Sequence, residues 1–399
     1  MRPAVLAVVA LVAAVLGASG ALVVAKASGW VDEDAGAVRT VVVSGQADAE
    51  PANAPTATPL AGDRFDPAAI FARSSPGVVT IYSLFADGGR SQGSGVVVSP
   101  EGHVLTNSHV ITNAGEGPGS VRGARRVYVV FADGDRIPAS IVGWDLFDDT
   151  GLIKFDPADH AVSPLPLGDS DAVVVGQPVA AIGSPFGNEN SLAVGVVSAV
   201  SRSIPSLTSR YNVANAIQID APINHGNSGG PLLDARGRVI GINAQIRSES
   251  GNAEGVGFAI PISAARRSME QLIEKGRVAY AYIGITTVDV TPAIARRYDL
   301  RSQRGALIEE VVENAPAERA GLKGAERREV FNGSPLSLGG DLIVSLAGER
   351  VVRADDIARI VTGRLRPGQL VSVLVVRGGT GKREVVRVRL IERPVDPEG

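Results

Sequence analysis

The chain has 399 residues, more than one typical domain holds, so its length predicts two or three folded units. Hydrophobic residues make up 45% and charged residues 20%, as in ordinary globular proteins, and the net charge of −3 argues against a nucleic-acid partner. The chain has no cysteine, which excludes disulfides, a cysteine nucleophile and thiolate metal sites.

The first segment, residues 1–27, is almost entirely apolar. Residues 3–25 contain no charged side chain, and a helix of this length spans a hydrocarbon layer of about 30 Å. Arg2 precedes the run and acidic residues follow it, which favours an N-terminus inside the cell and export of the rest. The length of the run favours an uncleaved, single-pass anchor in the cell membrane. The alternative is a signal peptide, because residues 25–27 fit an A-x-A cleavage site, and cleavage would give a secreted or periplasmic protein.

Residues 28–66 are rich in Ala, Pro, Thr, Gly and Asp and show little periodicity, which is typical of a flexible linker. A helical pattern at 67–72 and a helix at 262–275, capped by Gly276, bound a predicted domain of residues 67–276. Short strands without alternating helices favour antiparallel barrels or a sandwich over a doubly wound sheet. The strands are expected in Val- and Ile-rich runs at 78–82, 95–98, 127–131, 179–182 and 239–242.

A second β-rich unit is predicted at residues 280–393. A helix is expected at 355–362, and residues 324–340 are interpreted as an irregular insert rich in Gly and Ser. Strands are expected at 306–312, 342–346, 370–376 and 385–390.

The strongest local signal for chemistry is the sequence GNSGGP at residues 226–231. A serine hydroxyl is a poor nucleophile unless a base takes its proton and donors stabilise the oxyanion. Glycines on both sides let the backbone turn sharply, so that the amides of Gly226 and Ser228 can converge on one point. The alternative is an ordinary Gly-rich hairpin turn.

The base has to be a histidine that precedes Ser228. The segment also fits the nucleophile elbow of α/β-hydrolases, but that fold needs a histidine after the serine, and all four histidines come earlier. His109 is favoured because an apolar strand runs into a polar turn there, so its ring can be held rigidly at a cleft. His225 is expected to point elsewhere on the serine turn, and His103 and His160 stand among turn residues and are expected to be solvated.

A catalytic triad also needs an acid that fixes the imidazole tautomer and stabilises the imidazolium. Asp149 immediately precedes an apolar run, where an aspartate can be buried beside a strand. Asp145 and Asp148 are close competitors, and a solvated acidic turn is the alternative for all three.

An ordered set of motifs resembles the HtrA (DegP/DegS-like) serine proteases over about residues 65–275. The resemblance implies a mostly β fold with a chymotrypsin-like double β-barrel, and a triad of His109, Asp149 and Ser228. Thr150 and Gly151 depart from the family, which has a branched apolar residue and then Ala after the aspartate. The motifs are TNSHV at 106–110, Asp149 followed by LIK at 152–154, IGSPFG at 182–187, QIDAPIN at 218–224, GNSGGPL at 226–232 and GFAIP at 257–261.

The same resemblance implies how substrate is held. The amides of Gly226 and Ser228 would form the oxyanion hole, and Ile223, His225 and Ile246 would bind substrate. Ile223 and Ile246 would form the wall of the primary specificity pocket, which predicts cleavage after small aliphatic residues such as Val or Ala. The alternative is that both isoleucines are core residues.

The sequence YIGI at residues 282–285 resembles the carboxylate-binding loop of PDZ domains. Successive amides at Ile283, Gly284 and Ile285, next to Tyr282, can capture a terminal carboxylate, and the peptide would then add as a strand beside a helix near Asp355. An ordinary strand is the alternative. Supporting motifs are GALI at 305–308, APAERAGL at 315–322, GDLI at 340–343 and RPG at 366–368.

The resemblance implies a serine endopeptidase for unfolded or misfolded proteins outside the cytoplasm, in envelope quality control and the stress response. C-terminal peptides would regulate it through the PDZ domain, the family forms homotrimers or higher oligomers, and the chemistry needs no metal or cofactor. Two alternatives are a chaperone-like scaffold with weak or no proteolysis and a pure peptide-binding adaptor.

Overall fold

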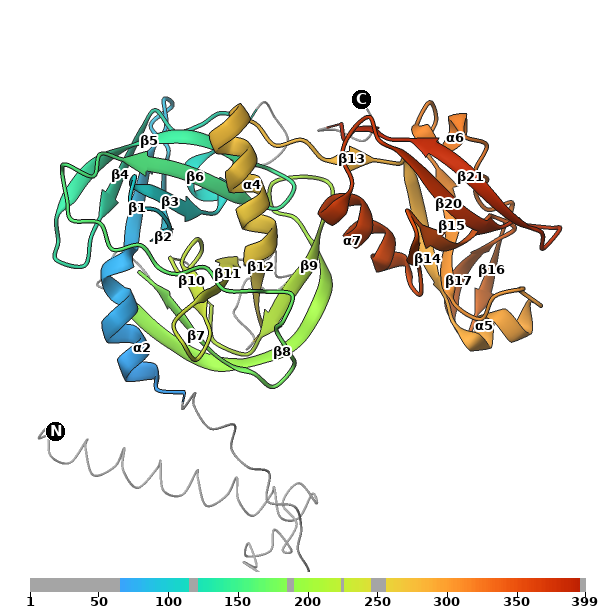
Figure 1. Cartoon of the computed structure of the whole chain (residues 1–399), viewed down its shortest axis with the longest axis horizontal. Coiled ribbons are helices and arrows are strands. Elements are labelled where there is room, and N and C mark those ends of the chain that lie inside the picture. The colour runs from blue at the N-terminus through green and yellow to red at the C-terminus, as the bar shows by residue number, and fades with distance from the viewer. Residues whose placement is uncertain (1–64, 115–120, 185–189, 224–225, 245–255, 395–399) are drawn as a thin grey trace, which may run out of the picture. The chain divides into compact units, whose positions relative to one another are not determined.

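The computed structural model of the protein describes residues 65–114, 121–184, 190–223, 226–244 and 256–394 (Figure 1). Within these residues, no helix is both long enough and apolar enough to cross a membrane. The predicted anchor or signal segment at 1–27 and nearly all of the predicted linker at 28–66 lie outside the described residues.

Two closed six-stranded antiparallel barrels form the larger part of the fold, as the sequence predicted (Figure 1). The first barrel has the strand order β1-β2-β3-β6-β5-β4 and the second β10-β11-β12-β9-β8-β7. The strands of the first are β1 Val78–Leu84, β2 Arg90–Val97, β3 His103–Thr106, β4 Arg126–Val130, β5 Arg136–Asp145 and β6 Thr150–Phe155. Those of the second are β7 Pro178–Gly183, β8 Ser191–Pro205, β9 Asn212–Ile219, β10 Pro231–Leu233, β11 Val239–Ala244 and β12 Gly257–Pro261.

Helices cover and join the barrels. α2 (Pro67–Ser74) begins at Asp66, whose carboxylate caps the helix by accepting from the amide of Ala69 at 3.1 Å. α3 (Ser108–Ile111) is a single turn. α4 (Ile262–Lys275) has the predicted bounds, and Gly276 ends it in the left-handed conformation at φ 69°.

The hydrophobic core has a shared part between the two barrels. Leu105 and Leu152 of the first barrel belong to the same buried cluster as Ile182 and Leu233 of the second, and Leu272 of α4 packs there as well. Each barrel also has its own interior cluster. Because burial of apolar surface is the main favourable term in folding, the shared cluster fixes one barrel against the other. The loops that meet at this contact are therefore held in fixed positions relative to one another.

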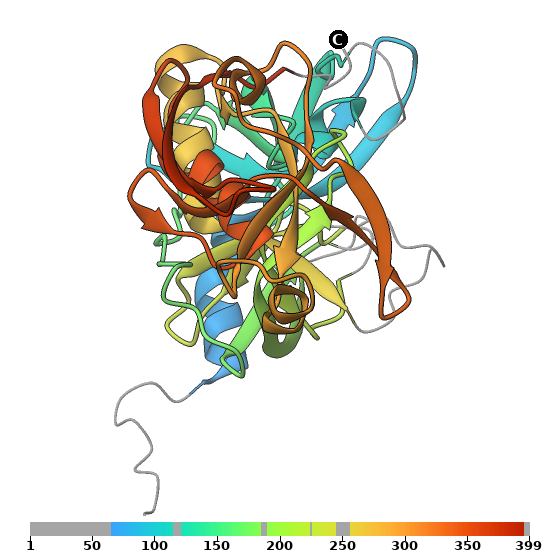
Figure 2. The same cartoon turned by 90° about the vertical axis from the view of Figure 1, so that its right-hand side faces the viewer.

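The C-terminal domain is built around one antiparallel sheet, seen from the side in Figure 1 and turned toward the viewer in Figure 2. Its strand order is β14-β15-β18-β20-β21, so β14 lies at an edge, and β19 pairs with β18. The strands are β13 Ala281–Tyr282, β14 Ile285–Val290, β15 Gly305–Val311, β16 Arg327–Phe331, β17 Ser334–Leu338, β18 Leu342–Leu346, β19 Glu349–Arg350, β20 Leu370–Val376, β21 Arg383–Arg389 and β22 Ile391–Glu392. The helices are α5 Pro292–Arg297, α6 Pro316–Arg319 and α7 Ala354–Arg364.

The segment 324–340 is regular, so its interpretation as an irregular insert was wrong. β16 and β17 pair as an antiparallel hairpin from Arg327 opposite Leu338 to Phe331 opposite Ser334. Asn332 and Gly333 form the two-residue turn with positive φ angles of 50° and 81°. An Asn-Gly pair is the preferred sequence for such a turn, and this signal was present in the sequence.

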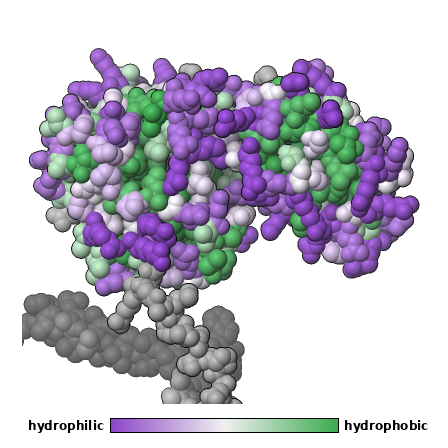
Figure 3. Space-filling view, viewed as in Figure 1, coloured by the Kyte–Doolittle hydropathy of each residue, from purple (hydrophilic) through white to green (hydrophobic). Residues whose placement is uncertain are grey.

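Hydrophilic residues cover much of the molecular face in Figure 3, and hydrophobic residues reach the surface in smaller areas of both domains. Among the large apolar side chains that are exposed, Val194, Val196 and Val200 all belong to β8. Some exposed apolar side chains are normal on the surface of soluble proteins.

Candidate active site

Ser228 lies in a tight turn that is anchored from the other barrel. Ser94 on β2 donates its hydroxyl to the carbonyl of Gly226 at 2.6 Å, and its amide donates to the carbonyl of Ser228 at 2.8 Å. The same hydroxyl of Ser94 accepts from the amide of Ser184 at 2.9 Å. The barrel contact thus sets the position of the serine turn. No local pattern in the sequence indicates this role of Ser94.

The glycines around Ser228 are required by space as well as by backbone angle. Gly229 has φ +86°, and a Cβ there would lie 2.1 Å from the carbonyl oxygen of Ser94 and 2.3 Å from the hydroxyl of Thr106. Gly226 has φ +98°. Both angles are ones that L side chains rarely adopt. The turn therefore depends on glycine at these two positions, and in this it differs from an ordinary hairpin turn.

His109 lies on α3, one turn of helix that directly follows β3, and not at the end of a strand as the sequence suggested. Its ring nitrogen Nδ1 is 2.8 Å from Oδ2 of Asp149. The other carboxylate oxygen, Oδ1, accepts from the amide of His109 at 3.1 Å and from the hydroxyl of Ser108 at 2.8 Å. Asn107 adds a bond from its side-chain amide to the carbonyl of Asp149 at 2.9 Å. Three consecutive residues thus fix one aspartate.

Asp149 is only 3% exposed and takes a positive φ of 44°. Aspartate tolerates this left-handed conformation better than most residues. The competing carboxylates do not contact His109: both Asp145 and Asp148 point to the hydroxyl of Tyr280. Of the three candidates, Asp149 is the one that the fold brings to the histidine.

The charge state of His109 is set by two opposing effects. Burial lowers the pKa of the imidazole, but the carboxylate of Asp149, through its charge and its hydrogen bond, more than offsets this and raises the pKa of His109 above its ordinary value. A neutral imidazole is the form that can accept a proton. The site therefore requires a pH above this raised pKa to place a free base beside the serine turn.

The hydroxyl of Ser228 is buried, and within the described residues it has no hydrogen-bond partner. The described part of the chain likewise offers no backbone acceptor to the amides of Gly226 and Ser228. In proteins without substrate, catalytic hydrogen bonds are often long and form only in the complex. Among the described residues, the hydroxyl of Ser228 thus has no partner and the two predicted oxyanion donors have no backbone partner, which is an arrangement suited to a reacting carbonyl.

Of the predicted substrate-binding residues, only Ile223 can be described. It is 9% exposed and packs in the interior cluster of the second barrel, next to Gly257. His225 and Ile246 lie outside the described residues. The assignment of Ile223 to a specificity pocket stays a prediction.

His103 and His160 are more enclosed than the sequence suggested. His103 lies on β3 and is 2.8 Å from the hydroxyl of Ser99. The His160 side chain is only 13% exposed, because its ring stacks on Phe131 at 3.7 Å between centroids and contacts Asp133 at 2.9 Å. Asp133, Asp135 and His160 have ligand atoms within 4.8 Å of one another, but exposed acidic groups of this kind are common without a metal.

The YIGI segment forms a loop between β13 and the edge strand β14. Gly284 has φ +78°, and a Cβ there would lie 2.2 Å from Cβ of Ala315. The carbonyl of Ile283 accepts from the amide of Ala317 at 2.9 Å, and that of Gly284 accepts from Val312 at 3.0 Å. These bonds turn the carbonyls toward their own domain. Among the described strands β14 is an edge strand, and it lies beside α7, as a peptide-binding groove requires.

Comparison with known proteins first indicates the class of protein to which the chain belongs. Residues 93–242 match the trypsin-like peptidase domain, and residues 281–389 match the PDZ domain. A probable periplasmic serine endoprotease, DegP-like, from Hahella chejuensis is 37% identical over 310 residues, which are 78% of this chain and 59% of that protein. A similarly named protein from Marinomonas sp. is 38% identical over 308 residues, 77% of this chain and 58% of that protein. The chain thus spans less than two thirds of these relatives.

Solved structures narrow the class to a family. The structure of the HtrA-type protease AlgW with a tripeptide is 33% identical with a TM-score of 0.67, and the match covers 82% of this chain and 98% of that one. The serine endoprotease from Yersinia pestis is 29% identical with a TM-score of 0.59 and is covered to 98%. The chain belongs to the HtrA family of trypsin-like serine proteases with a PDZ domain.

Proposed function

We propose that this protein is a serine endopeptidase that cleaves unfolded or misfolded proteins outside the cytoplasm. The observation that carries the proposal is the part-buried contact of 2.8 Å between His109 and Asp149, formed beside a serine turn that Ser94 anchors across the barrel contact. Relatives named periplasmic serine endoproteases support both the reaction and the compartment.

In the proposed reaction, Oγ of Ser228 attacks the carbonyl carbon of the scissile peptide bond. The free Nε2 of His109 takes the hydroxyl proton and then gives it to the leaving amine, while Asp149 holds Nδ1 and balances the positive imidazolium. The amides of Gly226 and Ser228 donate to the oxyanion, each worth roughly 2.7–4 kcal/mol. Water then enters, His109 removes its proton, and hydrolysis of the acyl ester frees Ser228.

The domains are proposed at residues 67–276 for the peptidase and 280–393 for the PDZ domain. Residues 1–27 are proposed to anchor the chain in the membrane, with 28–66 as a linker, so that the catalytic part works outside the cytoplasm; the uncharged run at 3–25 supports this. Assembly into homotrimers or higher oligomers is proposed from family membership alone.

The test of the proposed function uses casein as an unfolded substrate and a fluorophosphonate as a probe of activated serines. The purified chain is expected to degrade casein, to lose this activity on treatment with the probe, and to carry the added mass on the peptide that contains Ser228. A chain that neither degrades casein nor reacts at Ser228, but slows aggregation of an unfolded protein, would instead be the chaperone-like scaffold.

The residue after which the protein cleaves its substrate is a separate prediction. Because Ile223 is apolar, a peptide library is expected to show cleavage after small aliphatic residues such as Val or Ala. A preference for Arg or Lys would contradict the assignment of this residue to the pocket wall and would leave it as a core residue of the second barrel.

Peptide binding by the PDZ domain is proposed to use the amides of Ile283, Gly284 and Ile285. Gly284→Ala is expected to weaken binding of a C-terminal peptide at least about tenfold, because the new Cβ would lie 2.2 Å from Ala315 and displace the loop. The measurement is fluorescence anisotropy of a labelled peptide that ends in a free carboxylate.

Gly368→Ala is the matched control for this substitution. Gly368 has a similar φ of +83°, but a Cβ there meets nothing within 4 Å, so the variant carries the backbone strain without the clash. If both variants bind peptide equally well, the loop at 282–285 does not hold the carboxylate.

A further inference from the structure

The turn that presents Asp149 to His109 joins β5 to β6 and is held by a second aspartate. Oδ1 of Asp145 accepts from the amide of Phe147 at 2.9 Å and from that of Asp148 at 3.4 Å. The next residue, Asp149, is in the left-handed conformation. A non-glycine residue in this region persists only when its surroundings hold it there. The carboxyl group of Asp145 is one of the groups that do so.

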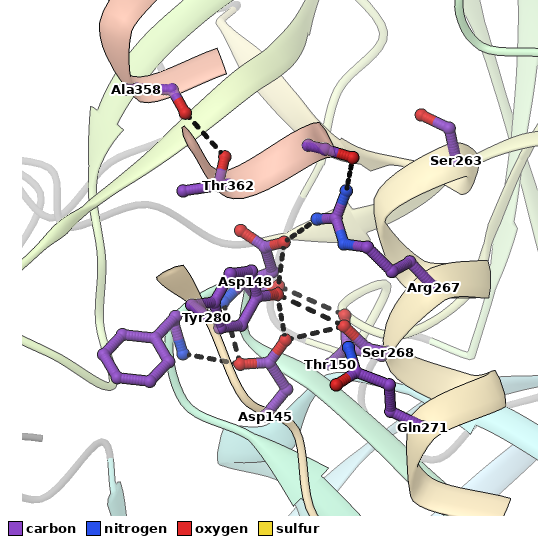
Figure 4. A network of polar contacts seen from close by, with 12 residues as sticks. Asp145, Asp148, Thr150, Ser263, Arg267, Ser268, Gln271, Tyr280, Ala358 and Thr362 are labelled. Carbon is purple, nitrogen blue, oxygen red and sulfur yellow. Dashed lines mark hydrogen bonds and ion pairs between the residues drawn. The ribbon is translucent and has the colours of Figure 1, made fainter. Parts of the chain in front are cut away.

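The other side of this turn belongs to a buried polar cluster, drawn in Figure 4. The hydroxyl of Tyr280 is 2.5 Å from Oδ2 of Asp145 and 2.7 Å from Oδ2 of Asp148. The hydroxyl of Ser268 on α4 is 2.7 Å from the same Oδ2 of Asp145 and 3.3 Å from the hydroxyl of Tyr280. All four residues are 5% exposed or less. Unmade hydrogen bonds here would therefore be costly.

Counting hydrogens shows that hydrogen bonds at every contact of the cluster need one more proton than its hydroxyl groups supply. The phenol of Tyr280 has one hydrogen and can donate it to only one of its two carboxylate neighbours. The second contact would place lone pair against lone pair unless that carboxyl group is protonated and donates to the phenol oxygen. Two short contacts to one phenol thus require a protonated carboxyl group in the pair.

The charges around the cluster indicate which aspartate holds the proton. Arg267 on α4 forms an ion pair of 3.1 Å with Asp148, so the negative charge is compensated there. Asp145 has no ion-pair partner within the described residues; the guanidinium of Arg393 lies over the ring of Tyr280, 5.5 Å from its centroid, and its charge acts on both aspartates from there. Burial, and then the charge of Asp148, raise the pKa of Asp145 to about 6. While Asp145 holds this proton, the hydrogen bonds run from Asp145 to Tyr280, and from Tyr280 to Asp148.

Tyr280 does not come from either barrel. It lies between the end of α4 at Lys275 and the start of β13 at Ala281, on the segment that leads into the C-terminal domain. Its carbonyl accepts from the amide of Arg393, just beyond the last strand of that domain, at 2.8 Å. A residue outside the barrels therefore completes the packing behind the catalytic aspartate proposed above.

We propose that Tyr280 is a positioning residue for proteolysis, whose hydroxyl holds the turn of Asp149 in its working shape through Asp145 and Asp148, most firmly while Asp145 keeps its proton. This inference rests on the proposed function, in which Asp149 orients His109. Loss of this proton would leave two carboxylates facing one phenol and loosen the turn. A purely structural cluster would affect stability but would not change kcat selectively or alter its pH profile.

The test measures kcat and KM on one peptide substrate from pH 5 to pH 8 for three full-length variants. Tyr280→Phe removes the phenol group and is expected to lower kcat about tenfold with little change in KM. Tyr298→Phe removes a phenol on the surface of the C-terminal domain and serves as the matched control. Circular dichroism and thermal unfolding establish that each variant is folded.

Asp145→Asn gives the sharper result. The asparagine amide can donate to Tyr280 and accept from the amide of Phe147 at every pH, as only the protonated carboxyl group does in the native chain. The ratio of its kcat to that of the native chain is therefore expected to rise with pH, severalfold between pH 5 and pH 8. Deprotonation of His109 affects both proteins alike and cancels in this ratio.

The outcomes separate this inference from the proposed function. If the native chain cleaves the peptide but Tyr280→Phe matches Tyr298→Phe in kcat and pH profile, the positioning role is wrong and the protease stands. A ratio for Asp145→Asn that stays constant with pH overturns the role of the proton on Asp145. If the native chain neither cleaves nor reacts with fluorophosphonate at Ser228, the proposed function itself fails and the positioning role fails with it.

Discussion

Ser228→Ala is expected to lower kcat for peptide cleavage by roughly 10⁴- to 10⁶-fold, because it removes the only proposed nucleophile. The turn itself should survive, since Ser94 holds it through the carbonyls of Gly226 and Ser228 and neither bond uses the deleted hydroxyl. The measurement is cleavage of a fluorogenic peptide, with circular dichroism to confirm the fold. The residual rate reports what the oxyanion donors and substrate binding contribute alone.

Ser140→Ala is a suitable control for this variant. Ser140 is an exposed residue on β5, and its hydroxyl makes one surface bond to the carbonyl of Lys154 at 3.2 Å. It is expected to cleave at close to the native rate. A Ser228→Ala protein that kept a tenth of the native kcat would show that another group attacks the substrate.

Asp149→Asn is expected to lower kcat by about 10⁴-fold, although the side chain keeps its size. An asparagine amide that donates to Nδ1 of His109 leaves the proton on Nε2, the nitrogen that has to accept the proton of Ser228. The hydroxyl of Ser108 and the amide of His109 would also lose a charged acceptor.

The pH profile of the same variant tests the electrostatics. In the native chain kcat/KM rises with pH as His109 loses its proton, at a pH above the ordinary histidine value, since Asp149 raises the pKa. In Asp149→Asn the burial remains and the carboxylate charge is gone, so the inflection is expected to move to lower pH. Asp156→Asn, at an exposed turn, should leave both rate and inflection as they were. An unmoved inflection in Asp149→Asn would mean that another charge controls His109.

Local sequence signals predicted regular elements well. Helix α4 begins at Ile262 and ends at Lys275 as expected, because a proline directly precedes it in the sequence and a glycine directly follows it. Strands β18 and β20 have their predicted bounds for a similar reason, since each is an apolar run interrupted by a single serine. The hairpin at 324–340 was missed because its strands mix polar and apolar residues, so that the Asn-Gly turn was the clearest signal.

The candidate site was harder to predict where it depends on contacts between distant segments. The sequence left three aspartates open around Asp149, and only the fold brings one of them to His109 while turning Asp145 and Asp148 toward Tyr280. Nothing near Ser94 or Tyr280 in the sequence marks either residue, because each acts on a turn far away along the chain. The catalytic roles of His109, Asp149 and Ser228 stay predictions until the variants are measured.

The hydrogen bonds of Ser94 have a consequence for a newly synthesised chain. One hydroxyl from the first barrel holds both Gly226 and Ser184 of the second, while His109 and Asp149 belong to the first barrel and Ser228 to the second. Under the proposed function, two barrels that have folded but not yet docked keep the base His109 apart from the nucleophile Ser228. Under that function, a copy whose barrels have not docked cannot cleave its neighbours, and proteolysis begins only when the two barrels come together.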